Sequence, residues 1–431
     1  MSAGAGVRER TAAGGGSAPE RVGPLTGLRR ALANPAANYV LIVASVLALT
    51  GFGLLMVLSA SSITAYQGGA GSSYAIFARQ ALFALAGLVL AFGLSRVPGG
   101  WWRPLAWFAF PAALGLQSLV LTPLARAEGG NQNWVALGPA IVQPSEFLKV
   151  AFALWLAAVL SRPGARERPW STWGLSLLGF GAAGGLIMAG GDLGTAIIVF
   201  ALYLGALFVA DLPVMATVGT CVAGAGAAAL LVVTNANRMQ RVAAMMAGHA
   251  EAGSDDYLSS HWQSAHGTYA LASGGWFGVG LGASREKWAW LPEAHNDFIF
   301  AIIGEELGLL GSLIVIALFV VLAAGLLRMA LRTPHAQVRV LVAAVFMWLI
   351  GQATVNIAVV ATLLPVIGVP LPFVSAGGSS LVANLIMIGV VLSFARDEPG
   401  VAEALRLRGR RVPEAARTSS SSRTSKETTA P

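Results

Sequence analysis

An acidic cluster comes just before one of the most apolar segments of the chain. Glu293, His295 and Asp297 stand in the sequence LPEAHNDFIF, and a long apolar run follows. A carboxylate at a partly desolvated helix end can have a raised pKa and act as a general base. The alternative is structural, because Asn296 or Asp297 could cap the helix that follows. The spacing alone leaves both roles open.

Two more acids, Glu305 and Glu306, lie about two helical turns deeper in the same apolar run. A carboxylate in hydrocarbon costs roughly 2.5–3.5 kcal/mol on insertion scales, so such a residue usually has a partner or lines a cavity. The flanking Gly304 and Gly308 could let the helix bend here. The sequence favours a structural or cavity-lining role for both glutamates.

A second charged motif, QPSEFLK, combines a predicted helix start with an acid and a base. Pro144 and Ser145 are typical of a first helical turn, with Ser145 as the cap. Glu146 and Lys149 are three residues apart and can form an ion pair on one helix face. Lys149 could instead bind an anionic headgroup, and the spacing does not decide between these roles.

Two glycine-rich segments interrupt the apolar pattern. The sequence GGDLGT, at 190–195, is typical of a tight turn between helices. The sequence VIGVPLPFVSAGGSS, at 366–380, is rich in Pro, Gly and Ser. Irregular backbone at membrane depth is tolerated only where it lines a cavity or packs within protein. We therefore expect a re-entrant or cavity-lining loop, with Ser375 and Ser379 as candidate substrate-binding residues.

The composition predicts a membrane protein. Of the 431 residues, 56% are hydrophobic and 11% are charged, whereas soluble proteins have about 25% charged residues. The net charge of +8 could indicate nucleic-acid binding. Its distribution along the chain favours membrane orientation instead, so no nucleic-acid partner is expected. The single cysteine, Cys221, excludes an intrachain disulfide.

The apolar segments predict an all-α polytopic membrane protein with ten transmembrane helices. These segments are approximately 39–60, 77–95, 104–122, 146–160, 173–189, 195–210, 213–233, 297–327, 340–363 and 379–395. The Lys and Arg residues lie mostly on one side of them, which predicts that both termini are cytoplasmic. A large extracytoplasmic loop, about 234–296, then separates helices seven and eight. The basic tail 1–38 and the polar tail 397–431 are predicted to be disordered and cytoplasmic.

Five segments together resemble the SEDS family of bacterial cell-wall synthesis, which comprises FtsW, RodA and SpoVE. They are GNQNWVALGPAIVQPSEFLKVA, GGDLGTAIIV, ALASGGWFGVGLGAS, LPEAHNDFIFAIIGEELGLLG and LLPVIGVPLPFVSAGGSSL. The resemblance covers about 39–396 and excludes only the tails. It implies a ten-helix fold with a large outer loop between the seventh and eighth helices.

The resemblance implies a peptidoglycan glycosyltransferase that polymerises lipid II outside the cell membrane. The family's essential acid corresponds to Asp297, which would act as general base in an inverting displacement or bind a divalent cation, Mg²⁺ or Mn²⁺. Cationic help for the leaving diphosphate would come from such a cation, Lys149, Arg285 or Lys287. No organic cofactor is expected. Asn296 stands where the family often has Thr.

The same resemblance extends to further substrate-binding candidates and to partners. Glu146 and Lys149 match the family's QPSExxK motif, and Glu293 and His295 belong to the motif of the essential acid. The expected partners are lipid II, the nascent glycan strand, a class B penicillin-binding protein transpeptidase and other membrane proteins of the divisome.

Two alternatives stay open at this point. The sequences PEAHNDFIF and FVSAGGSS are more similar to the septal division branch, FtsW, than to the elongation branch, RodA. A transporter that flips lipid II would need a similar cavity. The motifs cluster on the predicted outer face, which favours the polymerase.

Overall fold

The long helices of the structure coincide with the apolar runs of the sequence. The structure is a computed structural model that describes residues 34–67, 72–128, 131–138, 140–247, 260–288 and 290–405. The helices that correspond to the predicted segments are α2 (Ala37–Gln67), α3 (Ala75–Leu94), α4 (Trp102–Ser118), α5 (Pro144–Leu160), α6 (Pro169–Ala189), α7 (Leu193–Val209), α8 (Val214–Val233), α11 (Ile299–Arg332), α12 (Ala336–Val360) and α13 (Gly378–Asp397).

Within the described residues, eight helices are long and apolar enough to cross a membrane. The two other predicted spans, α5 and α7, have 17 residues each. The chain is therefore a mostly helical, multi-pass membrane protein, and the total of ten spans stays a prediction. The two tails predicted to be disordered lie mostly outside the described residues.

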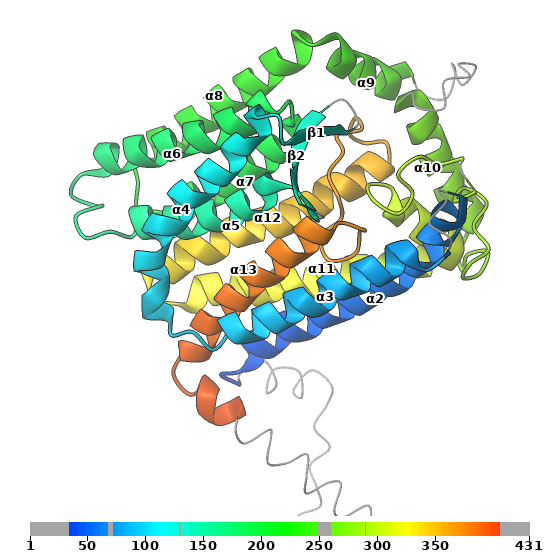
Figure 1. Cartoon of the computed structure of the whole chain (residues 1–431). Helices are drawn as coiled ribbons and strands as arrows, with labels where there is room; N and C mark the ends of the chain where they lie inside the picture. Colours follow the sequence, from blue (N-terminus) through cyan, green and yellow to red (C-terminus); the bar gives the residue numbers. More distant parts are fainter. Residues whose placement is uncertain are drawn as a thin grey trace, which may run out of the picture.

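Helix α5 lies inside the bundle, where α4, α6, α7, α12 and α13 contact it (Figure 1). Every residue of α5 except Phe147 is buried. Such a helix need not match the bilayer thickness, because protein surrounds it. The prediction that Ser145 caps α5 is wrong: the cap position is Gln143, Pro144 is the first helical residue, and no side-chain cap bond forms.

A small antiparallel sheet between α4 and α5 corrects the all-α prediction. Its strands are β1 (Ala125–Glu128), β2 (Asn131–Leu137) and β3 (Ala140–Val142), and β2 is central. Val135 faces Ala125 on one side and Val142 on the other, and its side chain is fully buried. The backbone pairs within the sheet, so this polar segment between two predicted helices has regular structure.

Two helices occupy the predicted loop between α8 and α11. They are α9 (Ala236–Ala247) and α10 (Ser260–Gly274). Helix α10 packs along α11, while α9 continues from the end of α8 at the edge of the molecule (Figure 1). Most of α8 is exposed, including Cys221. Residues 248–259 lie outside the described part of the chain.

Helix α11 is broken at Gly308, whose φ of 68° is in the left-handed region that favours glycine. The adjacent segment 275–280 hydrogen-bonds to the backbone groups freed by the break. Leu309 and Leu310 donate to the carbonyls of Gly275 and Trp276 at 2.9 and 3.2 Å. In return, the amides of 279 and 280 donate to the carbonyls of 305 and 306 at 2.9 and 3.0 Å.

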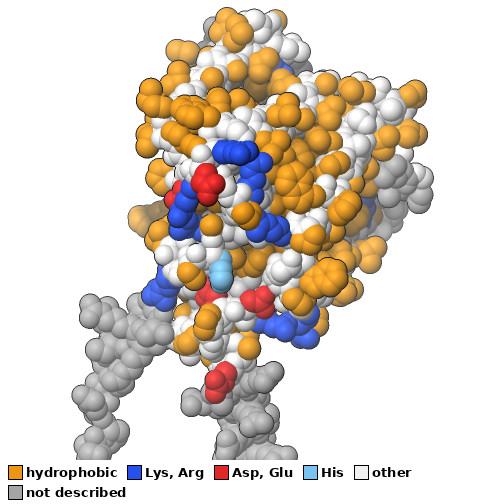
Figure 2. All heavy atoms as spheres, turned by 90° about the vertical axis from the view of Figure 1, so that its left-hand side faces the viewer, with side chains coloured by type: hydrophobic (Ala, Val, Ile, Leu, Met, Phe, Trp, Pro, Cys, Tyr) orange, Lys and Arg blue, Asp and Glu red, His pale blue; other side chains and the backbone are white. Residues whose placement is uncertain are grey.

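The chain enters the helical bundle at α2 and leaves it after α13 on the same face. A Cβ atom on Gly400 would lie 3.5 Å from Pro35, so the segments before α2 and after α13 are in contact. Figure 2 shows that Lys and Arg side chains surround a few acids on this face. Ion pairs and hydrogen bonds link several of them, such as Arg166 with Asp211 at 2.6 Å and Arg103 with the Ser161 carbonyl at 3.1 Å.

Candidate active site

Asp297 lies just before α11, at the end of the segment that connects α10 to α11. The cap position of α11 is Phe298, and no side-chain cap bond forms there. The capping role considered for Asn296 or Asp297 is therefore wrong. Within the described residues, no donor hydrogen-bonds to the Asp297 carboxylate, whose Oδ2 lies 3.4 Å from where a Cβ on Gly368 would be. A glycine at this position of the 366–380 loop leaves room beside the acid.

The surroundings of Asp297 favour its protonated form. Burial is the largest of the influences that raise the pKa of Asp297 to about 7. The negative charges of Glu293 and Asp192 raise this pKa as well, and the positive charge of Arg241 lowers it. Asp297 is half-buried and retains contact with solvent. A carboxyl group with a pKa near neutrality can both accept and release a proton under physiological conditions.

Two residues that the sequence analysis did not assign to the site, Asp192 and Arg241, act electrostatically on Asp297, and a third, Arg238, lies close to Arg241. Asp192 caps α7 by accepting from the Thr195 amide at 2.8 Å, which confirms the predicted turn and also places an acid near Asp297. Arg241, on α9, donates to the Val366 carbonyl at 3.3 Å. Arg238, one turn earlier, donates to the Gly191 carbonyl at 3.2 Å.

The structure brings three of the predicted site residues to Asp297 or its segment. Glu293 is exposed and has a φ of 55°, and its carboxylate accepts a hydrogen bond from the side-chain amide of Asn296. His295 is half-buried, and burial lowers its pKa. Ser375 is only 5% exposed and donates to the Asn296 carbonyl at 2.8 Å.

Ser379 and the Glu146–Lys149 pair lie at the buried ends of neighbouring helices. Ser379, at the start of α13, accepts from the Gln143 amide at 3.2 Å. Lys149 is 1% exposed and lies 2.9 Å from the Glu146 carboxylate. It also donates to Gln352 Oε1 at 3.2 Å. The structure thus favours the internal ion pair over a headgroup contact for Lys149.

Lys287 also forms a buried ion pair. Its ammonium group lies 2.9 Å from the Glu306 carboxylate, and both residues are at most 3% exposed. Ser59 on α2 donates to the same carboxylate at 2.6 Å. This placement supports the structural role favoured for Glu306, and the substrate-binding role of Lys287 stays a prediction.

Glu305 has a comparable structural environment. Its carboxylate accepts from the Ser284 hydroxyl and, at 2.8 Å, from the Arg285 amide. The Arg285 side chain is exposed, so its guanidinium stays available as a candidate substrate cation. Glu305 and Glu306 together bind the segment 284–287 to α11.

The described residues do not form a metal site of their own. No three His, Cys, Asp or Glu side chains of this part of the chain gather closely enough to hold an ion. Asp297 could contribute a single carboxylate. A Mg²⁺ or Mn²⁺ ion bound there would need most of its oxygen ligands from a substrate diphosphate and from water.

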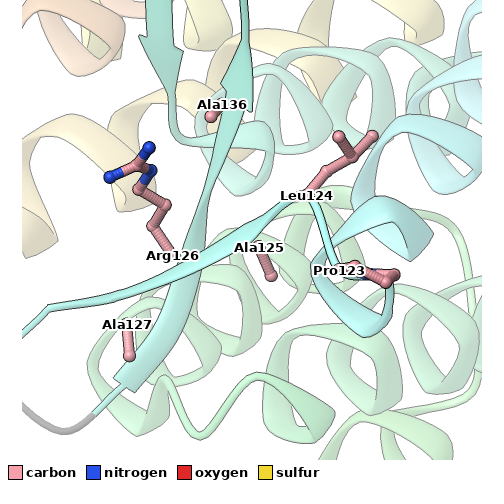
Figure 3. Close-up of a pocket in the computed structure, with 6 residues that line it drawn as sticks. All are labelled: Pro123, Leu124, Ala125, Arg126, Ala127 and Ala136. Carbon is pink, nitrogen blue, oxygen red and sulfur yellow. The ribbon is translucent and has the colours of Figure 1, made fainter.

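A pocket of about 550 Å³ lies against the small sheet and not against Asp297 (Figure 3). Three of the six described residues that line it are alanines, and Arg126 is the only charged one among these six. None of the predicted site residues lines it. Its wall offers one cation and no acid, so it lacks the groups that acid–base chemistry requires.

The family described as Cell cycle protein, which comprises FtsW, RodA and SpoVE, matches residues 39–399. The chain belongs to this family. Among its members, a Mycobacterium tuberculosis protein named probable peptidoglycan glycosyltransferase FtsW is 37% identical over 400 residues, which are 92% of this chain and 75% of that protein. Stage V sporulation protein E of Bacillus subtilis is 34% identical over 362 residues, or 83% of this chain and 97% of that protein.

Solved structures of FtsW/RodA/SpoVE proteins share the fold. The crystal structure of RodA from Thermus thermophilus matches with a TM-score of 0.62 and 29% identity, over 83% of this chain and 96% of RodA. A chain of a peptidoglycan synthase complex matches with a TM-score of 0.64 and 28% identity, over 83% of this chain and 97% of that chain. The predicted family and the predicted enzyme class, a glycosyltransferase, are confirmed.

Proposed function

We propose that this chain polymerises lipid II into peptidoglycan glycan strands on the outer face of the cell membrane. The observation that carries the proposal is Asp297: a half-buried acid with a pKa of about 7, in a chain whose relatives are named peptidoglycan glycosyltransferases. A general base is most effective when its pKa lies near the working pH.

The proposed reaction is a single displacement with inversion. The 4-hydroxyl of an acceptor N-acetylglucosamine attacks C1 of the donor N-acetylmuramic acid, and undecaprenyl diphosphate leaves. Asp297 takes the hydroxyl proton as the C–O bond forms. Because Asp297 has no hydrogen-bond donor among the described residues, its lone pairs are free to meet that hydroxyl.

Arg241 and Arg238 are the proposed cations for the leaving diphosphate, together with the exposed Arg285. Arg241 is close enough to influence Asp297 electrostatically. Unlike Lys149 and Lys287, these arginines form no ion pair with a carboxylate among the described residues. A guanidinium binds phosphate oxygens bidentately and keeps its charge when partly buried. A divalent cation, where present, would add to this charge.

The proposed topology places the basic face of Figure 2 in the cytoplasm. Cytoplasmic loops of membrane proteins are enriched in Lys and Arg. The segments before α2 and after α13 are in contact, which supports an even number of crossings and the proposed ten spans with both termini inside. Asp297, the small sheet and the segment 234–296 then lie on the outer side.

The proposed cellular role is septal, with a class B penicillin-binding protein as partner. Several relatives are named FtsW, which supports division over elongation. One structural neighbour belongs to a synthase complex that coordinates polymerisation and crosslinking. A fluorescent fusion of the full chain should concentrate at the septum, and an even distribution along the cell would favour the elongation role.

The experiment that tests the activity is lipid II polymerisation in liposomes with the transpeptidase partner. Wild type is compared with Asp297→Asn, with and without Mg²⁺ or Mn²⁺. We expect glycan strands from wild type and none from the variant at equal folding. Transfer of lipid II between leaflets without strand formation would instead establish a flippase.

A further inference from the structure

The backbone just before α11 is held at three consecutive carbonyls, 295–297. The amide of Ala376 donates to the first at 2.9 Å, and the Ser375 hydroxyl donates to the second at 2.8 Å. The side-chain amide of Asn356, on α12, donates to the third, which belongs to Asp297, at 2.8 Å. We call these three hydrogen bonds the carbonyl clasp.

Asn356 connects the acid to the loop that faces it. Its Nδ2 donates both to the Asp297 carbonyl and to the Val369 carbonyl, each at 2.8 Å. Both partners can only accept, which fixes the orientation of the amide. The side chain is 2% exposed. One buried amide therefore sets the spacing between the Asp297 backbone and the 366–371 backbone, which contains Gly368.

Ser375 makes a comparable connection one residue earlier. Its hydroxyl donates to the Asn296 carbonyl and accepts from the Leu371 amide at 2.7 Å. Its proton is used within the protein, so it has none to offer to a sugar or a phosphate. Gln80 on α3 also holds the loop. Its side-chain amide donates to the Ser375 carbonyl and accepts from the Gly377 amide, each at 3.2 Å.

We propose that Asn356 and Ser375 are positioning residues that hold Asp297 in its reactive place through the carbonyl clasp. The inference rests on the proposed function, because it assigns their effect to the base of that reaction. The clasp matters because α11 has no side-chain cap to hold its first turn. A misplacement of about 1 Å can lower a rate by roughly 10²-fold. Ser375 thereby changes from a substrate-binding candidate to a positioning residue.

The test compares Asn356→Leu, Ser375→Ala and Ser375→Thr with Thr354→Ala, an exposed position on the same helix. The rate and KM for lipid II are measured with the transpeptidase partner present. We expect Asn356→Leu to lower kcat by roughly 10–10²-fold, since it frees the Asp297 backbone, and to leave KM within about twofold. Ser375→Ala should lower kcat less, and Ser375→Thr, which keeps the hydroxyl, should restore it.

A second readout does not depend on activity. The infrared carboxyl band of Asp297, identified by its absence in Asp297→Asn, is titrated in each folded variant. Loosening the clasp admits water, so the midpoint should fall below its wild-type value in Asn356→Leu and Ser375→Ala. Ser375→Thr and Thr354→Ala should keep the wild-type midpoint.

The two readouts separate the clasp from the proposed function. Wild-type kcat together with an unchanged midpoint in Asn356→Leu would overturn the clasp and leave the polymerase proposal standing. If wild type forms no strands, the polymerase proposal fails, and the infrared midpoints still decide the clasp. If Asn356→Leu does not fold, the contrast between Ser375→Ala and Ser375→Thr decides it in the same way.

Discussion

Asp297 and the Glu305–Glu306 pair belong to the same acidic stretch of sequence but have opposite environments. Glu306 is fully buried and bonds to Lys287 and Ser59, and Glu305 bonds to Ser284 and the Arg285 amide. Asp297 is half-buried, and no donor among the described residues bonds to its carboxylate. A buried acid whose oxygens are fully bonded stabilises the fold, whereas one that lacks donors is available to a substrate.

The largest expected effect is the loss of activity in Asp297→Asn. Removal of the base should lower the polymerisation rate by about 10²–10⁴-fold. Because the folded state raises the pKa of Asp297 from 3.8 to about 7, its ionisation destabilises the protein as pH rises through that range. At pH 8 the variant should therefore melt no earlier than wild type. An Asp297→Asn variant that is active but unstable would reverse the comparison, because Asp297 would then stabilise the fold instead of acting as the base.

Glu306→Leu should have the opposite effect, because its main consequence is a loss of stability. It leaves the Lys287 ammonium buried without its carboxylate, which typically costs about 3–5 kcal/mol of stability. Thermal unfolding in detergent measures the loss. The double variant Glu306→Leu/Lys287→Met is the matched control and should recover most of it, because a buried ion pair can be replaced by apolar side chains. Failure of the double variant to recover would show that Glu306 does more than balance Lys287.

The pH dependence of kcat sharpens the comparison further. Asp297 must be ionised to accept a proton, so the rate should fall about tenfold per pH unit below about 7 and level off above it. Glu293→Gln removes a charge that raises this pKa and should shift the midpoint to lower pH. Arg241→Gln removes a charge that lowers it and should shift the midpoint to higher pH. Identical midpoints in all three proteins would contradict the assigned electrostatics.

The smallest expected effect is at the exposed ion pair of the basic face. Asp211 lies 2.6 Å from Arg166, and these side chains are 46% and 74% exposed. Solvent screens such pairs, so Asp211→Asn should change stability by no more than about 1 kcal/mol. Thermal unfolding under the conditions used for Glu306→Leu gives the comparison. A loss of stability as large as that of Glu306→Leu would mean that burial does not explain the difference between the two ion pairs.

The sequence predicted the helices well because apolar runs are local signals. All ten predicted segments coincide with helices, with boundaries a few residues apart. The small sheet was missed because strands as short as Ala140–Val142 depend on pairing with a partner, which local sequence does not specify. The cap at Ser145 was misassigned by two residues, since Pro144 takes the first helical position.

The site was predicted less completely because its parts come from distant segments. Asp297 was already a candidate from its position before an apolar helix, and the family resemblance selected it over the capping role. Arg241 and Asp192 lie on other elements, and no spacing pattern relates them to Asp297. Asn356 did carry a detectable signal, because an amide in a predicted transmembrane helix needs a partner. The sequence could not tell that Lys287 is neutralised by Glu306, since a charge and its burial are separate properties.

The break in α11 at Gly308 has a consequence for synthesis at the ribosome. The backbone groups that satisfy the break come from 275–280, which is translated before α11. The bilayer strongly disfavours unpaired amides and carbonyls. By the time the broken helix leaves the translocon, its missing hydrogen-bond partners already exist in the nascent chain. The order of translation thus lets the hydrogen bonds of the break form without any downstream segment.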